Sequence, residues 1–543
     1  MTSNPWIGRV RSHSTVPLLL AACAALSIHP PSVRAAQNNG LRSFEQSYES
    51  GVDLLRRGKP SEAFRVLDEG LKADPQNPRL LNAAGSALML LDRVQEATSY
   101  FKRAITSQPH FVPARKNLGI SLWTLGKVNE SREQFELVLK ESAKDSTTYL
   151  FLGLIASKEG QFEKAIQFLK EVPPALLDSR PEALLALAGS YFERDRSEEG
   201  LATVRRVSRL PALPPRWALL GGKLALEHGA YNDALTLLKA AEEDRPEASE
   251  ITYGLALAHY RLGQCGETIA LIQTAIQNGD QTGDIYNLLG WTEERIGNTR
   301  EAVQALRRAV ELEPEREDHY LDLSTICLDH EGGDDLAGEI VDIGLQKIPN
   351  SYRLLVQRGV ISEKRGRHGD ALRCFTAALR LRPSDPLALL SLGIAHWQAN
   401  ELREAVMTFS EGRHRFPADY RFFYFYGLAS EKLIQAAGRG VAALESARKA
   451  LQQSIVLSPE FPDSHFVLGK TWARTGQTQQ AQKEFERTLS LNPNHVEAKY
   501  WLSKIYRQSG RINEAAKLEG EVQAARRHKL EEESQIRIVL VRK

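Results

Sequence analysis

The sequence predicts an all-α solenoid, in which short pairs of helices stack one after another along the chain. Three observations predict this fold. Small and large apolar residues recur with a period of 34, in copies that start at residues 44, 78, 112 and 146, and again at 181, 215, 249, 283 and 317. Within a copy, apolar residues twice follow the i, i+4, i+7 spacing of one helix face. A helix pair of this size cannot bury that face alone, so it must stack on copies of itself.

The segment Pro462–His495 shows the repeat unit most clearly. Counted from 1 to 34, it has the small residues Gly469 at position 8 and Ala481 at position 20, the large Phe485 at position 24, and Pro493 at position 32. Small residues allow two helices to approach closely, and large ones fill the space between them. Proline ends the second helix before the next repeat begins.

About fourteen copies of this unit follow one another from Phe44 to about Lys529. In chain order they are marked by Gly51, Gly85, Gly119, Gly153, Ala188, Gly222, Ala256, Gly290, Tyr320, Gly359, Gly393, Gly427, Gly469 and Leu502. The spacing of L-G, A, F and P closely resembles the tetratricopeptide repeat family, in its exported bacterial form. The resemblance implies a right-handed superhelix of helix-turn-helix repeats, whose concave groove binds partner segments.

Bulk charge points to no nucleic-acid or membrane surface. The 543 residues carry a formal net charge of +2, which is close to balance. A repeat array of this length also needs no single large core, because each unit contacts only its neighbours.

The first 35 residues are expected to form a signal peptide. Arg9 and Arg11 precede an apolar run, Val16–Ile28, that is too short to span a bilayer but is typical of a secretory signal. Small residues at Val33 and Ala35 favour cleavage after Ala35, which leaves residues 36–43 as a polar linker. This favours export, with a periplasmic location.

Lipidation at Cys23 is the alternative. The sequence Leu20-Ala21-Ala22-Cys23 resembles a bacterial lipobox, whose cysteine carries a lipid anchor. The apolar run nevertheless continues past Cys23 to Leu26, where a lipoprotein would turn polar. Secretion is therefore favoured, and membrane contact is expected only through such an anchor.

The regular pattern is interrupted in four places. Proline pairs at both ends of residues 172–215 predict a soft joint in the superhelix rather than a domain boundary. The ninth repeat is one residue longer near Glu331, and the twelfth is longer around residues 435–443. Residues 530–543 form a polar cap and a tail, in which IRIVLV is either a strand or simply the chain end.

No motif of a known catalytic or cofactor site is present, so an enzyme, a cofactor and a metal site are not expected. The turn from His330 to Asp335 carries acidic residues but lacks the ligand spacing of a calcium loop. Cys265, Cys327 and Cys374 fall in different repeats, too far apart for a disulfide.

The candidate partner-binding residues lie on the first helix of each repeat. In the family, positions 2, 5, 9, 12 and 13 line the groove, and position 6 is added here for its aromatic residues. Large aromatic side chains are common anchors of interfaces, although packing between adjacent repeats is the alternative for each one. The candidates are Trp123, Tyr253, Tyr260, Trp291, Trp397, Tyr424, Phe425, Phe466, Lys470, Tyr500, Trp501 and Lys504.

Two ligand modes of the family match poorly. A carboxylate clamp needs lysine and asparagine at positions 5 and 9 of one repeat, whereas Lys116 is followed by Ile120. An asparagine ladder at position 6 is represented only by Asn117. The expected function is therefore a non-catalytic scaffold or adaptor for protein partners. The alternatives are a lipid-anchored envelope assembly factor and a substrate-recognition subunit of an enzyme on another chain; nothing indicates the oligomeric state.

Overall fold

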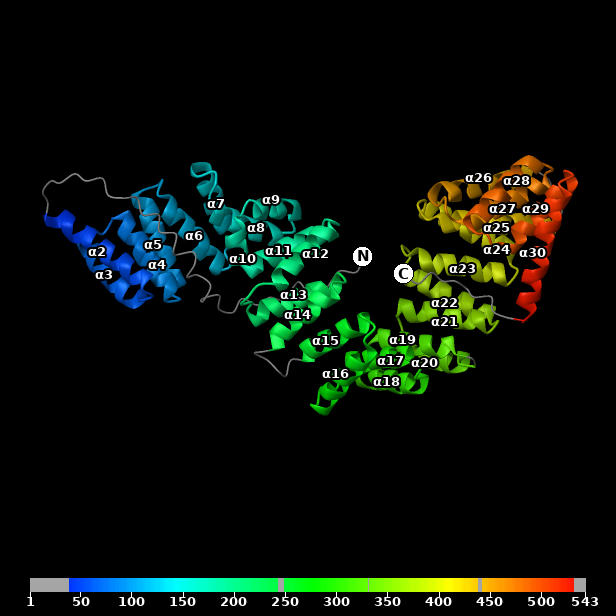
Figure 1. Ribbon diagram of the computed structural model, residues 1–543, viewed down its shortest axis with the longest axis horizontal. Coiled ribbons are helices and arrows are strands. Elements are labelled where there is room, and N and C mark those ends of the chain that lie inside the picture. The colour runs from blue at the N-terminus through cyan, green and yellow to red at the C-terminus, as the bar shows by residue number, and fades with distance from the viewer. Residues whose placement is uncertain (1–38, 243–248, 331, 438–441, 532–543) are drawn as a thin grey trace. The chain divides into compact units, whose positions relative to one another are not determined.

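The computed structural model describes residues 39–242, 249–330, 332–437 and 442–531, and all the regular elements within these ranges are helices (Figure 1). This confirms the all-α repeat fold. The expected signal peptide at 1–35, with Cys23, and the IRIVLV segment lie outside the described residues. None of the described helices combines the length and the apolar character that a bilayer span requires.

The chain forms two compact units, residues 1–279 and 280–543. The first unit contains α2 (Asn39–Arg56), α3 (Pro60–Ala73), α4 (Pro78–Leu90), α5 (Val94–Ser107), α6 (Val112–Thr124), α7 (Val128–Glu141), α8 (Ser146–Lys158), α9 (Phe162–Lys170), α10 (Pro174–Asp178), α11 (Pro181–Phe192), α12 (Ser197–Ser208), α13 (Pro215–Glu227), α14 (Tyr231–Glu242), α15 (Ser249–Arg261) and α16 (Cys265–Gln277). The sequence had indicated no boundary between the seventh and eighth repeats.

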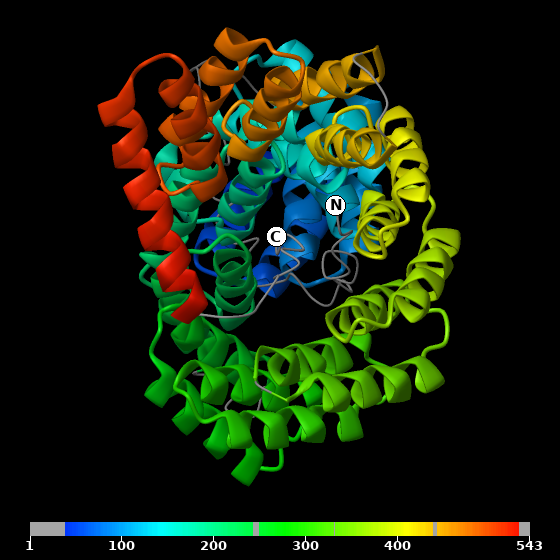
Figure 2. The ribbon, with the colours of Figure 1, turned by 90° about the vertical axis from the view of Figure 1, so that its right-hand side faces the viewer.

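The second unit continues the same alternation of first and second helices. It contains α17 (Gly283–Arg295), α18 (Thr299–Leu312), α19 (Glu317–Asp329), α20 (Asp334–Lys347), α21 (Tyr352–Lys364), α22 (His368–Leu381), α23 (Pro386–Gln398), α24 (Leu402–Arg415), α25 (Tyr420–Ala437), α26 (Ala442–Leu457), α27 (Pro462–Arg474), α28 (Thr478–Leu491), α29 (Val496–Gln508) and α30 (Ile512–Glu531). Within this unit each helix pair packs on the next, as Figure 2 shows from green to red.

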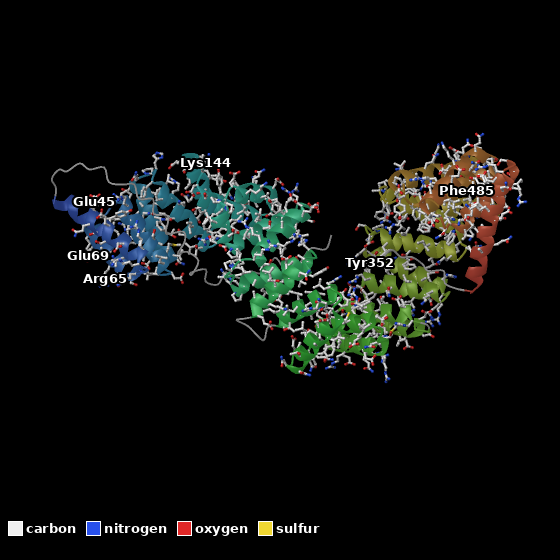
Figure 3. The ribbon with its side chains drawn as sticks, in the orientation of Figure 1. Glu45, Arg65, Glu69, Lys144, Tyr352 and Phe485 are labelled. Atoms are coloured by element: carbon white, nitrogen blue, oxygen red, sulfur yellow. The ribbon has the colours of Figure 1, made fainter. Side chains whose placement is uncertain are left out.

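In the repeats that have glycine at position 8, the core is a contact between position 8 and position 24. A methyl group added at Gly290 would lie 2.6 Å from Leu306 Cγ, and one added at Gly469 would lie 2.7 Å from Phe485 Cε1. Phe485, labelled in Figure 3, is fully buried. A side chain at position 8 would therefore occupy the space that the large residue fills, so glycine is required for close helix approach.

Two irregular regions differ from the sequence expectation in detail. After α9 the chain is extended at Pro173 (φ −54°, ψ 138°), and Pro174 begins the short helix α10, because the first helical position needs no N–H group. Val172 and Leu177 beside it are buried. In the twelfth repeat the extra residues lengthen both helices, to 18 residues in α25 and 16 in α26. At the beginning of the array, α2 starts at Asn39, within the expected linker.

The first helices of successive repeats lie side by side. Direct contacts join α17 to α19, α19 to α21, α23 to α25 and α25 to α27 in the second unit, and α2 to α4 and α4 to α6 in the first. We call the surface formed by positions 2, 5, 6, 9, 12 and 13 of these helices the first-helix face. It is the surface on which the candidate residues lie.

Candidate functional site

On the first-helix face of the second unit, side-chain contacts join neighbouring first helices from α17 to α21 and again from α23 to α29. Gln357 of α21 donates to Ser324 and Thr325 of α19 at 3.3 and 3.4 Å. At the far end, the ring of Phe466 in α27 lies 4.5 Å from that of His495, the N-cap residue of α29. Side chains on separate repeats therefore form one surface.

In repeats eleven and twelve, two aromatic candidates pack against other rings, whereas the third is half-buried beside a lysine. Phe425 stacks on the core ring of Phe409, with centroids 5.3 Å apart. Tyr424 packs against Phe425 and Phe461, at 4.9 and 5.0 Å, and burial raises the pKa of its hydroxyl. Trp397 is half-buried, and Lys432 Nζ lies 4.9 Å from the centre of its ring.

A buried carboxylate joins repeats twelve and thirteen. Glu431 of α25 is 1% exposed. Its Oε2 atom lies 3.2 Å from Lys470 Nζ, and its Oε1 atom lies 2.7 Å from Arg474 Nε. Two cations thus share one carboxylate, which leaves an excess of positive charge on this part of the face. A buried ion pair of this kind also fixes how the two repeats pack, since breaking it would strand a charge.

The fourteenth repeat carries an aromatic pair with a lysine over it. The Tyr500 and Trp501 rings are 6.4 Å apart. The exposed Lys504 has its Nζ atom 4.4 Å from the first ring centre and 5.7 Å from the second. Trp501 also stacks on the core ring of Phe485, at 6.1 Å. Lys504 is therefore the most accessible member of this group, and cation–π attraction positions it over the two half-buried rings.

At the other end of the unit the face is acidic. Asn287 Nδ2 donates to Asp322 Oδ2 at 2.8 Å, across the junction of α17 and α19. Burial raises the pKa of Asp322, and hydrogen bonds from Asn287 and Trp291 only partly offset that rise. Trp291, a candidate of the sequence, is thus an indole donor beside a carboxylate. Three residues further along α17, Glu294 pairs with His330 at 3.0 Å.

A nearby cluster of two carboxylates and a histidine has the residue types of a metal site, but its members are already paired with other side chains. Oxygen and nitrogen atoms of Asp284, Glu313 and His319 lie within 4.8 Å of one another. Arg316 lies 3.0 Å from Asp284 Oδ1 and 3.1 Å from Glu313 Oε2, so both carboxylates already have a cation. Asn287 Nδ2 faces His319 Nδ1 at 3.4 Å, which assigns the ring proton to Nε2, 3.3 Å from Glu313 Oε2. We assign the cluster as hydrogen-bonded ion pairs that join repeats eight and nine.

The first unit holds the remaining three candidates, Trp123 on α6 and Tyr253 and Tyr260 on α15, all half-buried. The Trp123 ring meets Phe151 edge-on at 6.3 Å, and Lys158 Nζ lies 5.5 Å from its centre. The structure therefore places these three candidates on the first unit and the nine others on the second.

The residues of the two poorly matching ligand modes are engaged within the fold. Lys116 Nζ lies 2.9 Å from Asp145 Oδ2, a carboxylate that also caps α8. Asn117 donates to Asn82 Oδ1 at 2.9 Å and joins repeats two and three. Both residues stabilise repeat junctions.

A hollow of about 490 Å³ lies elsewhere, at the end of α12, lined by Asp178, Arg205, Arg206 and Arg209 among others. It is distant in sequence from every candidate. Arg206 Nε already pairs with Asp178 Oδ1 and Arg206 Nη2 donates to the Pro174 carbonyl at 3.0 Å. We therefore place the candidate site on the first-helix face and not in this hollow.

Sequence reasoning missed Glu431 and Lys432 and did not single out Asp322. Glu431 stands at position 12 of its repeat, Lys432 at position 13 and Asp322 at position 6, and all three positions belong to the face. The signal that could have found them is a charged residue at a face position next to an aromatic one in the adjoining repeat.

Comparisons with known proteins agree with the repeat architecture. Models described as tetratricopeptide repeat match residues 48–110, 116–176, 219–282 and 359–420, then 283–316 and 473–528, which together make up more than half of the chain. BBSome complex member BBS4 of Mus musculus is 23% identical over 305 residues, 49% of this chain and 57% of that protein. Superkiller complex protein 3 of Mus musculus is 23% identical over 274 residues, 49% of this chain and 18% of that protein. The chain thus spans about half the length, or less, of these relatives.

Among solved structures, yeast Tom70 is similar, with 15% identity, a TM-score of 0.35, and coverage of 89% of this chain and 92% of that one. The APC/C hetero-tetramer Cut9-Hcn1 gives 12% identity, a TM-score of 0.34, and coverage of 91% and 99%. The family models match the same helix pairs that the Gly290–Leu306 type of contact defines. The chain belongs to the tetratricopeptide repeat family.

Proposed function

We propose that this protein is a non-catalytic scaffold that binds a segment of a partner protein on the first-helix face of its second unit. Repeats of this family imply protein–protein interaction. The observation that carries the location is the group of Tyr500, Trp501 and Lys504, where an exposed cation lies over two aromatic rings. Aromatic anchors with adjacent charge are the usual composition of an interface hot spot.

Lys504→Glu tests the location without disturbing the core, because the side chain is exposed. Its matched control is Lys483→Glu, on an exposed position of the second helix α28. Both variants of the full chain, and the wild type, would be used in quantitative affinity purification from a cell extract. A partner whose capture falls about tenfold with Lys504→Glu and is unchanged with Lys483→Glu supports the location. Equal capture by all three proteins would contradict it.

We further propose that the chain is exported and acts outside the cytoplasm. The support is the sequence of residues 1–35, in which arginines precede a short apolar run and small residues precede Ala36. Mass spectrometry of the mature N-terminus tests this. A start at Ala36 supports secretion, a lipid-modified Cys23 at the N-terminus would indicate the lipid-anchored alternative, and an intact Met1 would contradict both.

A further inference from the structure

The charges on the first-helix face of the second unit are ordered along the stack. Carboxylates gather at α17 and α19, where Asp322 and Glu294 lie. Cations gather at α25, α27 and α29, which carry Lys432, Lys470 and Lys504. The two ends therefore have opposite sign, and a partner that spans them must match both.

The acidic end keeps its negative charge. The hydrogen-bond donors to Asp322, Asn287 and Trp291, are neutral groups, so they orient the carboxylate and leave its charge in place. Burial raises the pKa of Asp322, which shows that its surroundings stabilise the charge less than water does. A cationic side chain from outside would provide the missing stabilisation.

The basic end keeps an excess of positive charge for a different reason. Glu431 balances only one of its two neighbours, Lys470 and Arg474. Lys432 and Lys504 lie over aromatic rings, at 4.9 and 4.4 Å, and a ring does not cancel a charge. Carboxylates of a partner would be attracted here.

Between the two ends position 9 of the face is apolar, although α21 also carries Gln357 and Lys364 at face positions 6 and 13. Val360 of α21 and Ile394 of α23 occupy position 9 of repeats ten and eleven and are half-buried, and Trp397 follows at position 12. Partly exposed aliphatic groups in the middle of a face favour aliphatic side chains on the segment that covers them.

We infer that this face binds one extended partner segment in a fixed charge order, with a lysine or arginine at Asp322, aliphatic side chains over Val360 and Ile394, and carboxylates at Lys470 and Lys504. The inference rests on the proposed function and adds the chemistry of the partner. Packed helices are about 10 Å apart, so four steps from α19 to α27 span about 40 Å. At about 3.3 Å per residue, a segment of about 12 residues joins the two ends.

Three synthetic 18-residue peptides with one neutral aliphatic core test the charge order by fluorescence anisotropy on the full chain. The first has three glutamates at one end and three lysines at the other, the second has glutamates at both ends, and the third has lysines at both ends. The peptide with opposite ends is expected to bind about tenfold more tightly than either of the others, since only it matches both charged ends.

Variants of the protein assign each end. Asp322→Asn keeps an acceptor for Asn287 and Trp291 while it removes the charge, and it should weaken the opposite-ended and the all-lysine peptides about tenfold but leave the all-glutamate peptide unchanged. Lys504→Glu should weaken the opposite-ended and the all-glutamate peptides instead. Glu339→Gln and Lys483→Glu, on exposed second-helix positions, are the controls and should change none. Thermal melts of each variant verify folding.

Two outcomes overturn the inference and separate it from the proposed function. If the all-glutamate peptide binds as tightly as the opposite-ended one, and Lys504→Glu weakens both while Asp322→Asn weakens neither, the face binds segments but has no charge order. If no peptide binds, or if Lys504→Glu and Lys483→Glu act alike, segment binding at this face fails as well.

Discussion

At the scale of single residues, Asp145 shows how one carboxylate stabilises a repeat junction. Its Oδ1 atom accepts the Thr148 N–H at 2.8 Å and so caps α8, and its Oδ2 atom lies 2.9 Å from Lys116 Nζ of the preceding repeat. Burial alone would raise the pKa of Asp145, but the hydrogen bonds from Lys116 and Thr148 outweigh it and hold the pKa below its ordinary value.

Asp145→Asn should therefore lower the free energy of unfolding by about 1–2 kcal/mol at neutral pH. Because the pKa is lower in the folded state, this stabilisation is present above the ordinary aspartate value of about 3.9 and is lost as pH falls through the folded value. Urea unfolding at pH 7 and at pH values below 4 should show the difference from wild type shrinking. Glu69→Gln, whose exposed partner is Lys72, should show no measurable change. A difference that stays constant with pH would contradict the assignment.

Substitutions of Tyr424 and Trp501 distinguish a residue that packs between repeats from one that binds the partner. Tyr424→Ala should lower stability, since the ring is packed against Phe425 and Phe461, whereas its effect on partner binding should be small. Trp501→Ala should weaken binding by about 1–3 kcal/mol, because the half-buried ring lies beside Tyr500 and Lys504 on the face. Urea midpoints and peptide affinity, measured on the same samples, distinguish the two effects. A Trp501→Ala variant that binds normally but melts early would assign this ring to inter-repeat packing alone.

At the scale of elements, a close contact joins a small residue to a large one within a helix pair. Where position 8 is glycine, position 24 is Leu or Phe, as in Gly290 with Leu306. Where position 8 is Ala188, the residue at position 24 is the smaller Val204, and where it is Ala256, that residue is the β-branched Ile272; both are fully or almost fully buried. In the pair of Ala188 and Val204 the smaller side chain makes room for the added methyl group.

Gly290→Leu should be strongly destabilising, by about 2 kcal/mol or more, because its side chain would overlap Leu306 and approach the Ala302 carbonyl, 3.1 Å from the added methyl. Gly520→Leu is the matched control, since a methyl group there meets nothing within 4 Å on the exposed side of α30. The control should be neutral or slightly stabilising, because leucine favours a helix more than glycine does. An unchanged urea midpoint for Gly290→Leu would show that this contact is absent.

The segment Val172–Pro215 is expected to open before the rest of its unit. Hydrogen exchange should show lower protection there than across Pro462–His495, because α10, at the start of the segment, has five residues and few helical hydrogen bonds. The buried Val172 and Leu177 act against this by anchoring the segment to the core. Equal protection in the two segments would mean that this anchoring prevails.

The helix pairs could be predicted from the sequence because their contacts are local, as between Gly469 and Phe485 of one repeat. The candidate face could be predicted only in part. Trp397 and Lys432 meet across two repeats, so their contact depends on the angle between helices, which no single repeat encodes. The sequence did not indicate the division between the two units after Gly279. That glycine has a positive φ like the turn glycines inside other repeats, so nothing in its residue type sets this turn apart.

At the scale of the whole molecule, the chain has two compact units, residues 1–279 and 280–543. Each unit has its own set of repeat junctions, such as Lys116 with Asp145 in the first and Lys470 with Glu431 in the second. In a linear array, stability is approximately a sum over repeats and their nearest neighbours.

Destabilisation should accordingly stay within one unit. In hydrogen exchange of the full chain, Asp145→Asn should reduce protection only within residues 39–279, and Gly290→Leu only within residues 280–531. The double variant should show the sum of the two effects, since the sites share no partner. A loss of protection in both units from either single change would show that the units unfold together.

Gly290 and Leu306, which contact each other, belong to the same repeat, so this contact does not depend on which repeats lie beside it during evolution. Duplication or loss of one whole 34-residue unit leaves every remaining contact of this kind intact, so the array can lengthen or shorten while each unit still folds. The order of charges from Asp322 to Lys504 has no such protection, because it depends on which units are neighbours. Inherited change in this molecule therefore preserves the architecture easily and alters the choice of partner quickly.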